Sequence, residues 1–137
     1  MIDLIPVRID GAIVLNLLND CRSKSYHCEI CTQLAINLHN WLKQMNIPYA
    51  IIDLQDEKEI CNTFLVEVLL LRKRLKFPFL FAGVMEDPQQ VLDSFSFPEK
   101  CPVFVTPEDA VRALRIHNPG LTEEMPKFEV KFGAPLM

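Results

Sequence analysis

The sequence is poor in glycine and histidine, and its charge has no strong excess of one sign. Its four glycines are too few and too scattered for a glycine-rich phosphate loop. The three histidines, His27, His39 and His117, fall on separate predicted elements, and no Ser/His/Asp or Cys/His spacing indicates a nucleophilic site. A net charge of −4 provides no basic footprint for nucleic acid. We therefore expect no nucleic-acid partner, no cofactor and no catalytic residue.

Long apolar runs are also missing, and those present are too short to cross a bilayer. The first ten residues contain acids and lack the layout of a signal peptide, so we expect a cytoplasmic protein without a transmembrane segment. In that compartment the five cysteines, an odd number, are expected to be reduced thiols. Half of the 137 residues are hydrophobic, which is enough for one domain with its own core.

The pattern of apolar residues predicts a single α/β domain over residues 1–117, followed by a tail, 118–137. Asp10-Gly11 is typical of a hairpin turn, and strand and helix patterns alternate after it. The predicted order is ββαβαβαβα, with a mixed, mostly parallel central sheet. The tail alternates around Phe128, Val130 and Phe132, so it is either loosely ordered or an added strand. Strands are predicted over 2–9, 12–18, 49–54, 77–84 and 102–105, and helices over 27–44, 62–76, 87–95 and 106–117.

The stretch from residue 48 to 74 organises the rest of the chain. A short apolar run ending at Asp53 predicts a buried strand, and a polar loop follows it. Asn62 stands where a helix N-cap is expected, ahead of an apolar helix. The loop therefore joins the carboxyl end of a central strand to the N-terminus of a helix, which is where ligands and partners dock in open α/β sheets.

Cys28 and Cys31 form a C-x-x-C motif at the predicted start of the first helix. A helix N-terminus lowers the pKa of a thiol, so this placement favours a thioredoxin- or glutaredoxin-like dithiol in which Cys28 attacks. Glu29 between them opposes the thiolate, and a structural role for both cysteines stays open. A zinc site that adds Cys21 and His27 lacks a second paired motif, and we predict no metal.

Several local strings, taken in order, resemble the STAS domain, the fold of bacterial anti-sigma factor antagonists. Asn19-Asp20 is similar to the end of that family's second strand, and Ile51-Ile52-Asp53-Leu54 to its central strand. The string VFVTPEDAVRAL, residues 103–114, is similar to its last strand and helix. The resemblance covers residues 3–116 and implies a non-enzymatic module of signalling and transcription regulation.

The chain departs from the family at the phosphorylation motif. Where the family has Asp-Ser-Ser-Gly, this chain has Cys61-Asn62-Thr63-Phe64. The position of the phosphorylated serine falls on Asn62, which has no hydroxyl. Thr63 is either a substitute acceptor at the positive end of the helix or only its first residue. Phe64 replaces a glycine, and an exposed ring there would block a docking surface or anchor a partner.

Three functions follow from these patterns. The first is a signalling module that docks a protein partner, an anti-sigma factor or kinase-like regulator, through the loop and helix at 55–67. The second is the dithiol oxidoreductase using Cys28 and Cys31, and the third is a sensor of a small ligand or nucleotide. A homodimer through a sheet edge or the tail is a further possibility. The residues predicted to bind the partner are Asp20, Asp56, Glu57, Cys61, Asn62, Thr63, Phe64 and Glu67.

Overall fold

The described part of the chain folds into alternating strands and helices in the predicted order. The computed structural model describes residues 2–19, 28–76, 78–95 and 100–117. The order ββαβαβαβα confirms the α/β fold expected from the sequence. The tail, 118–137, lies outside the described residues. The strands are β1 (Ile2–Ile9), β2 (Ala12–Asn19), β3 (Ala50–Asp53), β4 (Phe79–Ala82) and β5 (Val103–Phe104), and the helices are α1 (Glu29–Gln44), α2 (Asn62–Leu75), α3 (Glu86–Phe95) and α4 (Pro107–His117).

The strands of the described residues form one sheet in chain order, β1-β2-β3-β4-β5. β1 and β2 are antiparallel, and the turn between them, Asp10-Gly11, has positive φ at both residues, 49° and 84°. This confirms the predicted hairpin, since a type I′ turn requires that conformation twice. The other neighbours pair in parallel. β1 and β5 are the edges, so Pro6 lies on an edge strand, where a missing N–H is tolerated.

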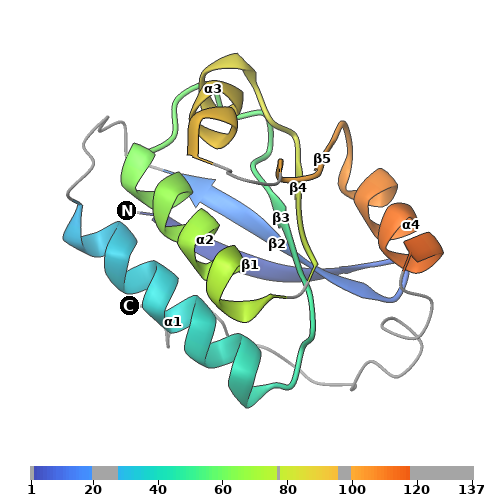
Figure 1. Ribbon diagram of the computed structural model, residues 1–137. Helices are drawn as coiled ribbons and strands as arrows, with labels where there is room; N and C mark the ends of the chain where they lie inside the picture. The colour runs from blue at the N-terminus through green and yellow to red at the C-terminus, as the bar shows by residue number, and fades with distance from the viewer. Residues whose placement is uncertain (1, 20–27, 77, 96–99, 118–137) are drawn as a thin grey trace.

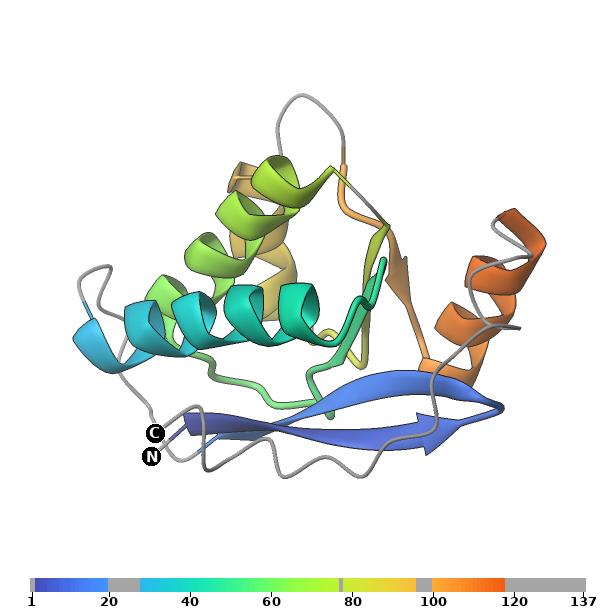
Figure 2. The same cartoon turned by 90° about the horizontal axis from the view of Figure 1, so that it is seen from below.

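Three helices cover one face of the sheet and the fourth covers the other. A right-handed crossover between neighbouring parallel strands always places its helix on the same side, and α1, α2 and α3 each belong to one such crossover. Figure 1 and Figure 2 show these three helices together, with α2 between α1 and α3, while α4 lies across β3, β4 and β5 on the opposite side. The parallel strands are therefore covered on both faces.

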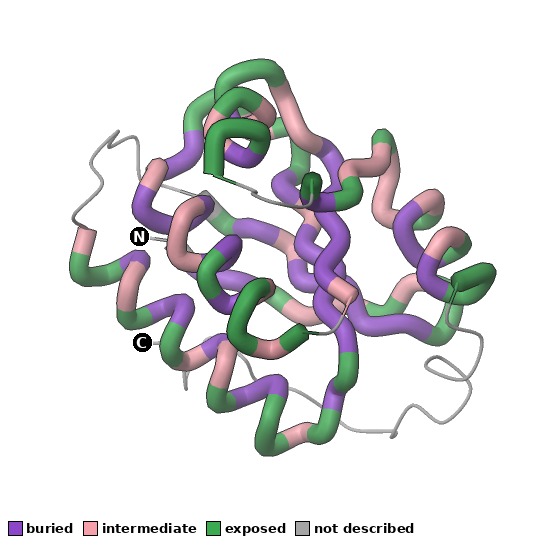
Figure 3. The backbone as a smooth tube through the Cα atoms, in the orientation of Figure 1, coloured by how far each residue is buried: buried purple, intermediate pink, exposed green. Residues whose placement is uncertain are grey.

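The inner strands make the centre of the core. All four residues of β4 are buried, and Ile51 and Ile52 of β3 are fully inaccessible to solvent (Figure 3). Tyr49, just before β3, is also fully buried, and its hydroxyl oxygen accepts the backbone N–H of Ile13 at 2.9 Å. Burial on both faces is what the continuous apolar runs of the sequence predict.

Helix ends agree with the predicted signals to within one or two residues, as is usual for helix boundaries. Asn46 adopts the left-handed conformation after α1, with φ of 55°, as expected for a helix stop. Asn62 was predicted as the N-cap of α2, but it is the first residue of the helix, and Cys61 is the N-cap. Similarly, α1 begins at Glu29 with Cys28 as its N-cap, whereas the sequence predicted a start at residue 27.

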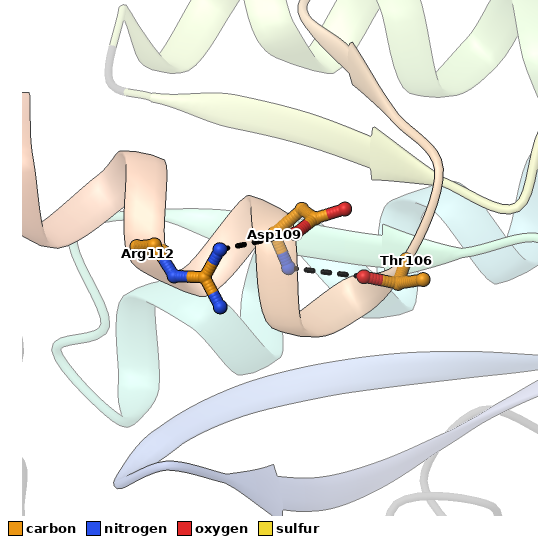
Figure 4. A network of polar contacts seen from close by, with 3 residues as sticks. All are labelled: Thr106, Asp109 and Arg112. Carbon is orange, nitrogen blue, oxygen red and sulfur yellow. Dashed lines mark hydrogen bonds and ion pairs between the residues drawn. The ribbon is translucent and has the colours of Figure 1, made fainter.

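The cap of α4 is the one that the sequence describes most fully. The Asp109 backbone N–H donates to Thr106 Oγ1 at 3.2 Å, and Pro107 opens the helix (Figure 4). One turn on, the Arg112 guanidinium lies 3.4 Å from the Asp109 carboxylate. The Arg112 side chain is 71% exposed and that of Asp109 is 43% exposed, so solvent screens the ion pair and it adds little to stability. The hydroxyl cap therefore sets where the helix starts.

Candidate functional site

The first turns of α1 and α2 meet above the carboxyl edge of the sheet. Each helix follows a parallel strand, and the two lie side by side in both views (Figure 1, Figure 2). We call residues 28–31 and 61–64 the α1–α2 corner, and residues 54–61 the β3–α2 loop. The corner holds the C-x-x-C motif, and the loop holds Asp56 and Glu57, two of the four acidic residues predicted to bind a partner.

Hydrogen bonds hold the start of the β3–α2 loop to the ends of the neighbouring strands. Gln55 and Asp56 both have positive φ, 53° and 56°. The Gln55 backbone N–H donates to Asp53 Oδ1 at 2.9 Å, and the Gln55 side-chain amide donates to the Leu17 carbonyl, also at 2.9 Å. The Asp56 N–H donates to the Gly83 carbonyl at 2.9 Å. The loop is therefore fixed to β2 on one side and to the end of β4 on the other.

Gly83 allows this close approach. Its φ is +61°, and a Cβ built there would lie 2.8 Å from Asp53 Oδ1 and 3.1 Å from the backbone nitrogens of Gln55 and Asp56. Only glycine fits without displacing the loop. The Asp53 carboxyl, packed into the same turn, has a raised pKa, mainly because of burial. The Gln55 N–H opposes that rise, and the Asp56 and Glu108 carboxylates add to it.

The structure divides the residues predicted to bind a partner into two groups. Asp56 is exposed, and Glu57, Asn62 and Glu67 are half-buried, so these side chains reach the surface. Asp20 lies outside the described residues. The remaining members of the predicted set are buried, with 0% of Cys61, 2% of Thr63 and 0% of Phe64 exposed.

Phe64 is therefore part of the core and presents no ring to a partner. It lies on the same inward face of α2 as Leu65 and Val68, both also fully buried. The sequence placed Phe64 among the residues predicted to bind a partner, because it replaces a glycine in the motif that begins the docking helix. Helical spacing with Val68, four residues on, was the signal that favoured burial.

Thr63 joins the two helices at the corner. Its Oγ1 accepts the backbone N–H of Cys28 at 3.1 Å, a contact between residues 35 positions apart in the chain. The Cys28 carbonyl in turn accepts the hydroxyl of Thr32 at 3.1 Å and its N–H at 3.0 Å. The hydroxyl predicted as a substitute phosphate acceptor is thus buried and engaged in holding the N-cap of α1.

Three cysteines meet at the corner. The sulfur atoms of Cys28, Cys31 and Cys61 all lie within 4.8 Å of one another, and none of the three is in a disulfide. Cys28 is partly exposed, whereas Cys31 and Cys61 are fully buried. Cys61 was predicted only as a docking residue. Its position before the helix of the neighbouring parallel strand was the signal that it could reach Cys28, because such helix starts share one sheet edge.

The environments of the two C-x-x-C thiols differ. The pKa of Cys28 is lowered, chiefly by the backbone N–H of Cys31, with contributions from the Cys31 and Cys61 thiols and opposition from burial. The pKa of Cys31 is strongly raised, chiefly because burial disfavours its thiolate, and the neighbouring Cys61 adds to the rise. Of the two thiols, Cys28 is therefore the one that ionises more readily.

A separate shallow hollow lies at the other end of α1. It has a volume of about 340 Å³ and is lined by Leu42, Lys43, Asn46, Ile47 and Pro48. Because α1 crosses the sheet from its carboxyl edge to its amino edge, this hollow is distant from the β3–α2 loop. It gives the predicted small-ligand site at that loop no support.

None of the helices in the described ranges combines the length and apolarity that crossing a bilayer requires. Comparison with protein-family models and with curated proteins finds no match for this chain.

Proposed function

We propose that this chain is a non-enzymatic signalling module that docks a protein partner, as its resemblance to anti-sigma factor antagonists implies. The observation that supports the proposal most strongly is the position and ordered backbone of the β3–α2 loop. It stands at the carboxyl edge of the central strand, and hydrogen bonds from Gln55 and Asp56 fix its backbone. A loop that is already ordered loses little conformational entropy on binding, which favours its use as a recognition element.

The partner is expected to present basic groups to this loop. Asp56 and Glu59 are exposed, Glu57 is half-buried, and Lys58 is the one cation between them. Complementary charge at the rim of an interface raises the association rate and fixes orientation more than it raises affinity. An anti-sigma factor or a kinase-like regulator with a basic docking face fits this description.

The residues of the α1–α2 corner support docking that is not controlled by phosphorylation. Asn62 has no hydroxyl, and Thr63 is buried with its oxygen accepting the Cys28 N–H. A kinase would have to pull the start of α2 away from α1 to reach Thr63. Incubation of the folded chain with ATP and kinases from cells that make it is expected to leave Thr63 unlabelled by mass spectrometry. Stoichiometric phosphate on Thr63 would contradict constitutive docking.

Site-specific crosslinking tests the docking surface. A photoreactive amino acid replaces Lys58, on the loop, or Arg112, an exposed residue of α4 on the opposite side of the sheet. We expect position 58 to give a saturable crosslink to one protein in cells that make the chain, and position 112 to give none. Once that protein is identified and purified, the pair can be studied directly.

Charge variants then test the role of the acids. Asp56→Asn keeps a residue that tolerates positive φ and removes one negative charge. It is therefore expected to slow association of the chain with its partner and to make the association rate less dependent on salt. Asp93→Asn makes the same change on α3 and is expected to have no effect. Equal crosslinking from positions 58 and 112, or equal effects of the two Asn variants, would contradict docking through the β3–α2 loop.

A dithiol oxidoreductase is the second candidate, favoured by the lowered pKa of Cys28 and its proximity to Cys31. The Cys28 thiolate would attack a disulfide substrate, forming a mixed disulfide and releasing one substrate thiolate. Cys31 would lose its proton to solvent and attack the Cys28 sulfur. That step would release the second substrate thiol and leave a Cys28–Cys31 disulfide, so that two electrons pass to the substrate.

Glutathione disulfide is the probe for this chemistry. With the reduced chain it should yield the Cys28–Cys31 disulfide, and Cys31→Ser should accumulate glutathione on Cys28. Cys101→Ser is the matched control, since Cys101 is buried apart from the cluster and its thiol contacts the Phe79 carbonyl at 3.7 Å. If glutathione is added at random among the cysteines, without an intramolecular disulfide, the oxidoreductase is excluded.

A further inference from the structure

We propose that Cys28, Cys31 and Cys61 form a site for one thiophilic metal ion of the Zn²⁺ class, which clamps the first turn of α1 to that of α2. The site is independent of the docking function proposed above. It rests on three sulfur atoms that two helices and a loop bring together from positions 28, 31 and 61.

The spacing of the sulfur atoms suits a common metal ion. Zinc–sulfur bonds of about 2.3 Å in a tetrahedral site place two sulfur atoms about 3.8 Å apart. The three thiols already lie within 4.8 Å of one another, so the longest separation has to close by only about 1 Å. Rotation about χ1 of the half-buried Cys28 can supply a movement of that size without displacing either helix.

Both helix N-termini favour the thiolates that a metal requires. Cys28 is the N-cap of α1, Cys31 lies in its first turn, and Cys61 is the N-cap of α2. The positive ends of two helix dipoles therefore point at one cluster. Glu29 opposes this field, but its side chain is exposed and screened by solvent. Burial also opposes the Cys31 thiolate, and the charge of a bound metal ion would offset that cost.

The third thiol distinguishes a metal site from a redox pair. A disulfide uses two sulfur atoms, and Cys31 is already the partner of Cys28 in the C-x-x-C motif. Cys61 comes from a different helix, is fully buried, and has its sulfur atom beside those of Cys28 and Cys31. Three thiolates from two elements form a clamp, which leaves the fourth position of a tetrahedral site open. In this arrangement water or a partner's ligand would complete the tetrahedron.

The hydrogen bond to Thr63 helps to position the cysteines that would bind the metal. It fixes the Cys28 backbone against the second residue of α2, and so sets the distance between the two N-caps before any ion binds. Contacts of this kind, which orient the groups that bind the metal, contribute strongly to metal affinity.

Cobalt titration of the full reduced chain tests the proposal. Co²⁺ takes the place of Zn²⁺ and gives sulfur-to-cobalt charge-transfer absorption that counts bound thiolates. We expect one Co²⁺ per chain, displaced by one Zn²⁺, and a melting temperature that rises when Zn²⁺ is added. Cys28→Ser and Cys61→Ser are expected to lower the affinity by more than about 100-fold, since losing a ligand exceeds the effect of losing a supporting contact.

Cys101→Ser is the matched control, because it removes a buried thiol outside the cluster and should bind Co²⁺ as the wild type does. Circular dichroism checks that each variant is folded, and Cys61→Ala replaces Cys61→Ser if the hydroxyl is not tolerated in the core. Cys21→Ser should also bind normally, and loss of binding there would overturn the three-thiol site.

The proposal fails if the reduced chain shows no charge-transfer band, or if Cys28→Ser and Cys61→Ser bind Co²⁺ as tightly as Cys101→Ser. It also fails if glutathione disulfide oxidises Cys28 and Cys31 to a disulfide as readily in the presence of Zn²⁺ as in its absence. Crosslinking from position 58 is measured separately, so failure of the metal site and failure of the docking surface are distinguishable.

Discussion

At the scale of single residues, the side chain's neighbours decide what the sequence leaves open. The sequence identified the start of α2 to within one residue but placed Cys61, Thr63 and Phe64 on a docking surface. All three are buried, because the first turn of α2 packs against α1. Local patterns mark a helix start well, whereas the direction that a side chain faces also depends on how the helix is rotated against its neighbours.

Phe64→Ala tests whether this ring belongs to the core. A fully buried phenylalanine that is truncated leaves a cavity, so we expect the free energy of unfolding to fall by about 3–5 kcal/mol. Leu70→Ala, on the exposed side of the same helix, is expected to change it by less than about 1 kcal/mol. Urea denaturation followed by circular dichroism measures both. A Phe64→Ala chain as stable as the wild type would place the ring at the surface.

Asp53→Asn tests the raised pKa of a carboxyl at the loop. Folding raises the pKa of Asp53, so this carboxyl ionises at a lower pH in the unfolded chain than in the folded one. Its ionisation therefore favours the unfolded state. At pH values below the unfolded pKa the carboxyl is protonated in both states and has no such effect. The penalty therefore develops as pH rises through the unfolded and then the folded pKa. We expect Asp53→Asn to gain stability relative to the wild type between about pH 3 and pH 7.

Asn can accept the Gln55 N–H as Asp53 does, so the substitution changes charge and keeps the hydrogen bond. Urea denaturation at several pH values gives the difference between the two chains. A difference that stays constant with pH would mean that ionisation of Asp53 is not its cause. Asp93→Asn, exposed on α3, is the control.

At the scale of elements, turn chemistry and capping were the most predictable features. Asp10-Gly11 and the stop at Asn46 depend on a positive φ that few residues adopt, and the start of α4 depends on the Thr106 hydroxyl. Each is where the sequence predicted it. The thiol cluster was predicted only in part. Cys28 and Cys31 are related by local spacing, but Cys61 joins them only because β2 and β3 are neighbours in the sheet.

Gly83→Ala tests the attachment of the β3–α2 loop. A Cβ at this residue would meet Asp53 Oδ1 and two backbone nitrogens, and its φ of +61° strains any L residue. We expect a loss of about 1–3 kcal/mol in the free energy of unfolding. Gly11→Ala is the comparison, because there the added Cβ meets the far end of the Arg115 side chain, at 3.2 Å, rather than backbone.

Hydrogen exchange distinguishes local from global effects of these two variants. Gly83→Ala should speed amide exchange at Gln55 and Asp56 in particular, since their backbone contacts are the ones disturbed. Similar losses in stability for both glycine variants, without a change in exchange at the loop, would mean that Gly83 is not needed for its position.

At the scale of the whole molecule, the fold class was predictable because strand and helix patterns alternate and the crossovers have one hand. The order of strands in the sheet follows from the same rule once each strand pairs with the next. Those patterns do not predict the partner or the chemistry of the α1–α2 corner. They depend on which side chains the folded chain brings together, and at the corner this is set by the packing of α1 against α2.

Truncation after His117 tests the predicted domain boundary. Among the described residues, the buried ones lie between Asp3 and Leu114, all before the predicted boundary. A chain ending at His117 is expected to unfold in one cooperative transition, with a free energy within about 1 kcal/mol of the full chain. A broad transition or a larger loss would extend the domain into the tail.

The strand order has a consequence for how this protein is made. Among the strands that the structure describes, no later strand inserts between two earlier ones, so each of their pairings joins segments that leave the ribosome in succession. The hairpin can form first, and each following strand can be added to the growing edge while synthesis continues. Nascent-chain force measurements should therefore show stepwise gains as β3 and then β4 emerge, ahead of release of the finished polypeptide.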